Sequence, residues 1–288
     1  MSVPENGNHS WSEPAPNPTA AGASPEIKPA AKPGKDAGVK RIEYLTSIRF
    51  LFSHPQWFKN LLLGGLCVLI PVLNQLLLFG YMYEIVERLH RGERGTYPLF
   101  DFSRFSTYIT RGVWPFLIAF IAQAIMQPAI QFPMQFGIFG LMAAFEADET
   151  TGAIAAAIGI PLALFGLLAL TVALTLVLTP LMLRAGLAQD FSQAFKFAWI
   201  KDFIRRMWLE AILVNLFMIL ANMILMPIGC LFFCYGGFMV AFGLTIPGAH
   251  LAWQLYELYL ARGGEPIPLK PLPADMPPIV LPPHKPLG

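Results

Sequence analysis

Charged side chains are scarce in this sequence, and four long segments contain none at all. Only 13% of the 288 residues are Asp, Glu, Lys or Arg, whereas 55% are hydrophobic, and the mean hydropathy is +0.54. An ordinary soluble domain is about 25% charged, so this composition excludes one. The net charge of +2 is too small to indicate a nucleic-acid partner.

Cysteine is also rare, with only Cys67, Cys230 and Cys234, and each lies inside an apolar segment. An odd number of cysteines in such surroundings excludes a disulfide framework. Cys230 and Cys234 are four residues apart and therefore share a helix face, but no His or carboxylate stands near them to complete a metal site. We interpret them as small core residues and expect no metal and no other cofactor.

The motifs of common catalytic centres are missing as well. The chain contains no HExxH zinc motif, no GxSxG nucleophile elbow and no GxxxxGK[ST] phosphate-binding loop. Its apolar segments hold no cluster of carboxylates for general acid–base chemistry. The sequence therefore predicts a protein that is not an enzyme.

The longest charge-free segment, Ala211–Tyr256, contains 46 residues. As one continuous helix it would be about 69 Å long at 1.5 Å per residue, whereas the hydrocarbon core of a bilayer is about 30 Å thick. The segment must therefore cross a membrane, turn and cross back, and Gly236-Gly237 is the expected turn. This feature predicts an integral membrane protein.

Three further charge-free segments complete the predicted architecture. Residues 112–145 and 152–183 each suffice for one crossing, and Pro128 and Pro133 are expected to end the first of these helices. The segment Leu61–Tyr83 is interrupted by Gly64-Gly65, by Pro71 and by Asn74-Gln75, and we favour a re-entrant or deeply kinked hairpin there over a fifth crossing. The predicted full crossings are residues 112–133, 152–183, 207–235 and 237–260.

Two amphipathic helices are predicted at the membrane surface. In the first, Ile42, Leu45 and Ile48 recur every three residues shortly before Trp57. The second lies between Arg184 and Arg206 and has an apolar face of Phe191, Phe195, Ala198 and Trp199. The predicted fold class is thus an all-α membrane protein, a bundle of four full transmembrane helices with a broken or re-entrant N-terminal segment and interfacial amphipathic helices.

Proline-rich segments flank this helical domain, which we assign to residues 40–262. Residues 1–39 have few large apolar side chains and are predicted to be a disordered tail, and residues 263–288 a loose C-terminal tail. Lys and Arg fall before Leu61, in 88–111, in 184–206 and after Leu260. The positive-inside rule then places these parts, with the C-terminus, on the cytoplasmic side of a bacterial inner membrane.

Neutral polar side chains form stripes on three of the predicted spans. Their helical spacing suggests faces that converge inside the bundle, either to line a path for a polar solute or to join helices by hydrogen bonds. We favour the second interpretation, because such bonds are common between membrane helices and contribute about 0.6 kcal/mol each on average. The residues are Gln123, Gln127 and Gln131, then Thr171, Thr175 and Thr179, and then Asn215 and Asn222.

Ionisable residues at membrane depth are the other functional candidates. His250 and Glu257 share a helix face with Gln254 between them, and Glu210 lies one turn inside its span near Arg206. A proton relay through His250 and Glu257 is the functional interpretation, and interfacial ion pairing is the plainer one. Glu84 and Glu87 stand at the end of the broken segment beside Arg88.

Residues 45–265 resemble a widespread prokaryotic family of polytopic membrane proteins known only as a domain of unknown function. The matching features are Leu61 to Gly65, Gly80-Tyr81, Glu87-Arg88, Arg91-Gly92, Pro98 to Phe102, Gly112 and Ala194-Phe195. The Pro-Leu-Phe-Asp-Phe run departs from the Leu-Pro-acidic form typical of that family. The resemblance implies a helical membrane protein and assigns no chemistry to any residue.

These observations favour a non-enzymatic membrane component that organises lipids or partner proteins. The expected partners are membrane lipids and other membrane proteins or a second copy, with no nucleic acid and no metal. The alternative is a permease or channel component for a small polar solute, which rests on the Gln, Thr and Asn stripes.

Overall fold

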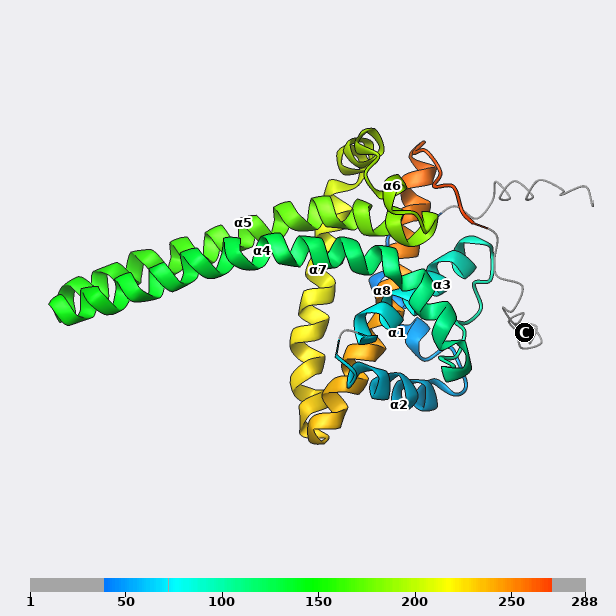
Figure 1. Cartoon of the computed structure of the whole chain (residues 1–288), viewed down its shortest axis with the longest axis horizontal. Coiled ribbons are helices and arrows are strands. Elements are labelled where there is room, and N and C mark those ends of the chain that lie inside the picture. The colour runs from blue at the N-terminus through cyan, green and yellow to red at the C-terminus, as the bar shows by residue number, and fades with distance from the viewer. Residues whose placement is uncertain (1–38, 72, 271–288) are drawn as a thin grey trace, which may run out of the picture. The chain divides into compact units, whose positions relative to one another are not determined.

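The computed structural model describes residues 39–71 and 73–270, and every regular element in them is a helix. The expected disordered tail lies outside the described residues. Figure 1 shows the arrangement. The elements in order are α1 (Tyr44–Leu51), α2 (Trp57–Val68), α3 (Leu73–His90), the short 3-10 helix η2 (Phe102–Arg104), α4 (Phe105–Ala147), α5 (Glu149–Ala188), α6 (Phe191–Ala194), α7 (Phe197–Leu231) and α8 (Phe233–Ala261).

Four of the described helices are long and apolar enough to cross a membrane. They cover Phe102–Ala147, Glu149–Ala188, Phe197–Leu231 and Tyr235–Ala261. These helices include the four predicted crossings, so the predicted all-α class with four spans is confirmed.

The expected end of the first span at Pro128 and Pro133 is wrong. Helix α4 contains both prolines, and Pro115 as well, and continues without a break to Ala147. Each proline removes only one backbone donor, and membrane helices tolerate this loss where neighbouring groups satisfy the freed carbonyl. Helix α5 runs beside α4 along this length (Figure 1), so the pair forms one long hairpin.

The broken segment is a pair of short helices that run in opposite directions along α8. On α2, Leu61 lies against Gly243, and Gly65 lies four residues later against Met239 and Tyr235. On α3 the order is reversed, because the Tyr81 ring stacks on Phe242 and His90 reaches Glu257. The chain therefore turns back between α2 and α3, as expected for a hairpin broken near Pro71.

The predicted second surface helix is absent as such. Helix α5 extends to Ala188 and ends where Gln189 adopts a left-handed conformation with φ 49°. The Asp190 carboxylate caps the single turn of α6 by accepting from the Ser192 N–H at 2.8 Å. Helix α7 then begins at Phe197 and continues into the membrane-span-like segment, so Trp199 is a buried core residue.

The segment after Arg262 is docked onto the helix ends as far as Lys270, contrary to the expected loose tail. Ile267 is buried, and its N–H donates to the Tyr256 hydroxyl at 2.8 Å. The Glu265 carbonyl accepts from Trp199 Nε1 at 2.8 Å, and its carboxylate pairs with Lys196 at 2.7 Å. Residues 263–270, which we call the strap, thereby join α7 and α8, and the rest of the predicted tail lies outside the described residues.

Ile267→Ala is expected to release the strap. Truncating a buried Ile typically costs about 2–5 kcal/mol, and here the loss falls on a segment with few other apolar anchors. Trypsin cleavage after Arg262 should therefore become at least tenfold faster, because proteolysis follows the population of the open segment. The exposed neighbour Pro268, replaced by Ala, provides the control, and equal rates in both variants would contradict the anchoring role of Ile267.

Candidate functional site: a buried ion-pair network

Three charged residues of α3, and Arg91 directly after it, lie on the face that meets η2 and the start of α4. Glu84, Glu87, Arg88 and Arg91 follow the i, i+3, i+4, i+7 spacing of a single helix face. Glu84 is fully buried, Glu87 is 1% exposed and Arg88 is 3% exposed. Burial of charge on this scale requires partners, and Arg104 of η2 and Arg111 of α4 provide them.

Glu84 is held by two arginines. Its carboxylate accepts from Arg104 Nη1 at 3.0 Å and Nη2 at 2.8 Å, and from Arg88 Nε at 3.1 Å. The two bonds from Arg104 form the bidentate arrangement that gives the strongest carboxylate contacts. Arg88 also reaches Glu93 at 3.1 Å, so the pairs form a continuous chain.

Glu87 is held in the same way one turn further along. Arg91 donates to its carboxylate from Nη2 at 2.6 Å and from Nε at 3.1 Å, and Arg111 of α4 donates to its other oxygen. Arg111 is 2% exposed. The network therefore joins the end of α3 to η2 through Glu84 and to α4 through Glu87.

This arrangement supports a structural clamp rather than proton transfer. Arginine stays protonated in proteins, so neither carboxylate has a neighbour in the network that gives up or takes a proton. Within the basic segment 88–111, Arg88, Arg104 and Arg111 are buried in the protein.

A further buried arginine lies at the end of α5. Arg184 is 1% exposed, and it donates to the backbone carbonyl of Gln193 and, at 3.0 Å, to that residue's Oε1. Its guanidinium lies 5.2 Å from the centroid of the Trp199 ring. Arg184 thus fixes the turn between α5 and α7 by hydrogen bonds and a cation–π contact.

His250 belongs to a polar cluster that fastens α1 to α8. Its Nδ1 lies 2.9 Å from both Ser47 Oγ and Gln254 Nε2, and its ring stacks on Phe50. Gln254 also accepts from the Glu43 N–H at 2.6 Å through Oε1. The glutamine therefore provides the N-terminal cap that α1 otherwise lacks, since the Glu43 side chain makes no capping bond.

The relay from His250 to Glu257, the alternative to ion pairing, has no continuous hydrogen-bond path among the described residues. Glu257 lies 2.6 Å from His90 Nδ1 on α3 instead, and Gln254 is engaged with α1. Glu210 pairs with Arg262 rather than with Arg206, which binds Asp202. Glu257 and Glu210 thus have ion-pair partners near helix ends, as in the ion-pairing interpretation, whereas His250 is held by neutral hydrogen-bond partners.

Two of the three polar stripes, those of Thr and Asn, meet at one point among the described residues, and the Gln stripe does not join them. Asn215 Nδ2 lies 3.4 Å from Thr179 Oγ1, and it also donates to the Ala211 carbonyl. Thr171 bonds the carbonyl of Leu167 in its own helix, and Thr175 is half-buried. The other stripe residues, Gln123, Gln127, Gln131 and Asn222, are exposed on the surface of α4 and α7.

No group of three or more His, Cys, Asp or Glu side chains is placed to hold a metal within residues 39–71 and 73–270. Cys67 is buried and Cys230 is exposed, and both are free thiols.

Several structural residues escaped the sequence reasoning because their partners are distant in the chain. Asn60 donates to the Tyr81 hydroxyl at 3.0 Å and accepts from the Phe100 N–H at 2.6 Å. Tyr81 in turn donates to the Pro98 carbonyl at 2.8 Å. Asn60 stands alone between Trp57-Phe58 and a run of Leu residues, and this local sequence does not indicate that its side chain bonds Tyr81 and Phe100.

The helices and the buried network define a helical protein with four membrane-span-like helices and a clamped end formed by α3 and α4. The chain belongs to the family described as Protein of unknown function (DUF4013), whose model matches residues 63–234. This agrees with the resemblance noted from the sequence. Neither the curated proteins nor the solved structures compared with the chain contain a match.

Proposed function

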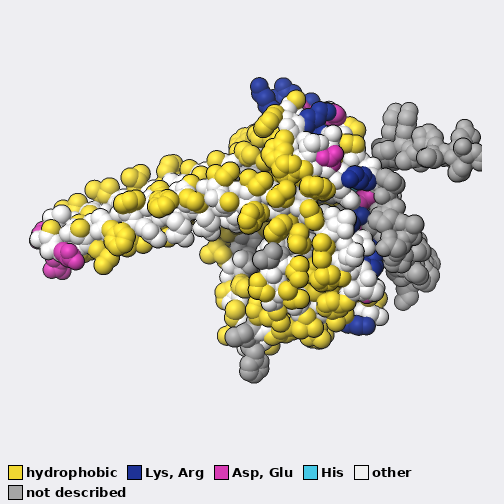
Figure 2. Space-filling view, in the orientation of Figure 1, with side chains coloured by type: hydrophobic (Ala, Val, Ile, Leu, Met, Phe, Trp, Pro, Cys, Tyr) yellow, Lys and Arg dark blue, Asp and Glu magenta, His cyan; other side chains and the backbone are white. Residues whose placement is uncertain are grey.

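We propose that this protein is a non-enzymatic membrane component that organises lipids or partner proteins. The observation that carries the proposal is the α4–α5 hairpin. From Ala129 to Leu170 only Gly152 is buried, although most of the side chains are apolar. Figure 2 shows this apolar surface extending to the acidic tip at Glu146 to Glu149.

The hairpin is also longer than one membrane crossing requires. Helix α4 has 43 residues and α5 has 40, so each is about 60 Å long. A helix tilted by as much as 40° crosses a hydrocarbon core of about 30 Å within about 39 Å of its length. The apolar surface beyond that length requires another cover, and a partner helix or bound lipid supplies it.

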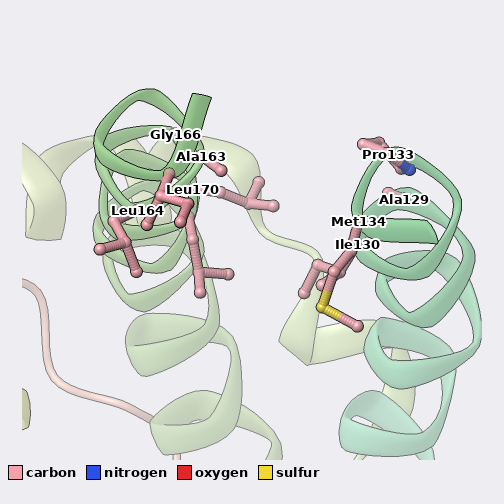
Figure 3. A pocket seen from close by; sticks show the side chains of 10 residues that line it. Ala129, Ile130, Pro133, Met134, Ala163, Leu164, Gly166 and Leu170 are labelled. Atoms are coloured by element: carbon pink, nitrogen blue, oxygen red, sulfur yellow. The ribbon is translucent and has the colours of Figure 1, made fainter. Parts of the chain in front are cut away.

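Shallow grooves along the hairpin offer suitable contact surfaces. One of about 480 Å³ lies between α4 and α5 and is lined by small and branched apolar residues, including Ala129, Pro133, Ala163 and Gly166 (Figure 3). Close approach of a helix is easiest where side chains are small. The lining has no charged residue, which is consistent with an apolar occupant rather than a transported ion.

The permease alternative draws less support from these contacts. A polar pathway needs stripes that face a common interior, whereas the Gln residues of α4 are exposed and lie away from Asn215 and Thr179. For the Gln residues to line a pathway, a second copy or a partner protein would have to cover this face of α4.

Thiol labelling in membranes distinguishes the two functions. Single cysteines replace Gln123, Gln127, Gln131 or Asp148 in a chain whose native cysteines are changed to Ala, and a small water-soluble maleimide is added. We expect the position 148 variant to react at least tenfold faster than the three Gln-stripe variants, because the tip is polar and the stripe faces lipid or protein. Equal rates at all four positions would indicate water at membrane depth and would favour the permease.

A further inference from the structure

A second groove, separate from the hairpin, runs between the α1–α2 corner and the α7–α8 pair. Its volume is about 490 Å³, and every side chain that lines it is apolar. Helices α1 and α2 and the corner between them contribute Ile48, Leu51, Phe52, Trp57, Phe58 and Leu61, and the other wall consists of residues between Leu225 and Phe232 of the α7 end and between Gly236 and Pro247 of α8.

The length of this groove corresponds to one leaflet of a bilayer. Its α8 wall extends from Gly236, near the α7–α8 turn, to Pro247 beside α1. The helix rises about 16 Å over this distance, at 1.5 Å per residue. Half of a hydrocarbon core of about 30 Å is about 15 Å, which is the depth reached by one lipid acyl chain.

The end of the groove at the α1–α2 corner has the features of a membrane–water interface. Phe52 is 52% exposed, Phe58 is 58% exposed and Trp57 lies between them in sequence. Aromatic side chains of this kind gather at the level of lipid head groups. The opposite end, near Phe232 and Gly236, has no polar lining residue.

The two charged residues that adjoin lining residues of the interfacial end in sequence are both positive. Arg49 follows the lining residue Ile48, and Lys59 follows the lining residue Phe58, and both are exposed. The sequence has no Asp or Glu between Glu43 and Glu84, and none from Ala211 to Tyr256. Both walls of the groove fall within these two acid-free segments, so neither wall carries a carboxylate that would repel a bound anion.

From this combination we propose that the groove binds one acyl chain of an anionic phospholipid, with the lipid phosphate near Arg49 and Lys59. The apolar wall supplies affinity, since each buried methylene contributes to binding, and the two cations supply selectivity for the head group. The start of α2 is also favourable for a phosphate, because no side chain caps it and its first turn contains no acid. The site deepens the proposed organising function by naming a lipid class.

Native mass spectrometry of the purified full chain in a mild detergent tests the site. The probe lipids are dioleoyl phosphatidylglycerol, which is anionic, and dioleoyl phosphatidylcholine, which has the same chains and no net charge. We expect the chain to retain one phosphatidylglycerol in preference to phosphatidylcholine. The double variant R49Q/K59Q should weaken phosphatidylglycerol binding roughly 30-fold, from about one kcal/mol per cation, and leave phosphatidylcholine binding unchanged. Its matched control is K201Q/R205Q, which removes two exposed cations of α7 away from the groove.

A second pair of variants tests occupation of the groove itself. Ile228 lines the groove and is 48% exposed, whereas Ile219 lies on the same helix, is 43% exposed and does not line it. Ile228→Trp should fill the groove and reduce retention of both lipids, and Ile219→Trp should change neither.

Three results would overturn the proposal: equal losses in R49Q/K59Q and its control, unchanged retention in Ile228→Trp, or a lipid-free dimer that assigns the groove to a second copy. The thiol-labelling experiment on the Gln stripe tests the organising function and does not depend on this groove. Failure of the lipid site and failure of the organising function are therefore distinguishable.

Discussion

Replacing Glu84 with Gln should strongly destabilise the protein. The substitution keeps the size of the side chain but removes the charge that holds Arg104 and Arg88, and both guanidinium groups stay buried. Removing one partner of a buried ion pair typically costs about 3–5 kcal/mol. We expect a large fall in the thermal unfolding midpoint, measured in detergent by intrinsic fluorescence.

The exposed ion pair between Asp202 and Arg205 provides the control for this prediction. Arg205 is 72% exposed, so Arg205→Gln should change stability by less than about 1 kcal/mol. The double variant E84Q/R104Q should recover part of the loss, because it no longer leaves Arg104 buried without its carboxylate. A midpoint of E84Q within error of that of R205Q would show that the network contributes no stability.

Gly80→Leu should disrupt the packing of α3 on α4. A Cβ at Gly80 would overlap the backbone carbonyl of Tyr108, and one at Gly112 would overlap that of Leu76. The two helix backbones therefore touch at both glycines, and a larger side chain must push them apart. The cost should reach or exceed the upper end of the ~1–3 kcal/mol typical of overpacking, since backbone rather than a flexible side chain must move. The measurement is the yield of monodisperse protein on size-exclusion chromatography.

Gly137 supplies a matched comparison on the same helix as Gly112. A Cβ at Gly137 would meet no atom within 4 Å, so Gly137→Leu should leave the yield of purified monomer nearly unchanged. Comparable yields for Gly80→Leu and Gly137→Leu would contradict the close contact between α3 and α4. Loss of partner or lipid binding in Gly137→Leu, with folding intact, would instead support the proposed contact role of the hairpin.

Prolines were the least informative signal for helix ends in this chain. Pro128 and Pro133 lie within α4, whereas Pro71 falls at the break between α2 and α3. The chemistry of the residue is the same in both places, but Pro128 and Pro133 lie within the antiparallel α4–α5 hairpin, whereas at Pro71 the chain turns back so that both α2 and α3 pack on α8. Whether a proline ends a helix was therefore decided by packing rather than by sequence.

Charge patterns located the important groups but not their partners. The sequence placed Glu84, Glu87, His250 and Glu257 near the ends of apolar segments, where the free-energy cost of a charged side chain in a membrane is lower than at its centre. It did not reveal that Glu84 joins Arg104 twenty residues away, or that Glu257 joins His90 across 167 residues. Helix periodicity predicts partners within one turn or two, whereas these pairs depend on how three helices cross.

The sequence by itself determined the class of the protein. Charge-free segments longer than a bilayer core leave no soluble alternative, because unpaired backbone groups and wide apolar faces require a helical membrane structure. The tertiary structure alone decided that α2 and α3 form a hairpin along α8, that the strap is docked and that Arg88, Arg104 and Arg111 of the basic segment are buried. These features depend on long-range contacts such as Tyr81 with Phe242 and Ile267 with Tyr256, and no local pattern encodes which distant surfaces fit together.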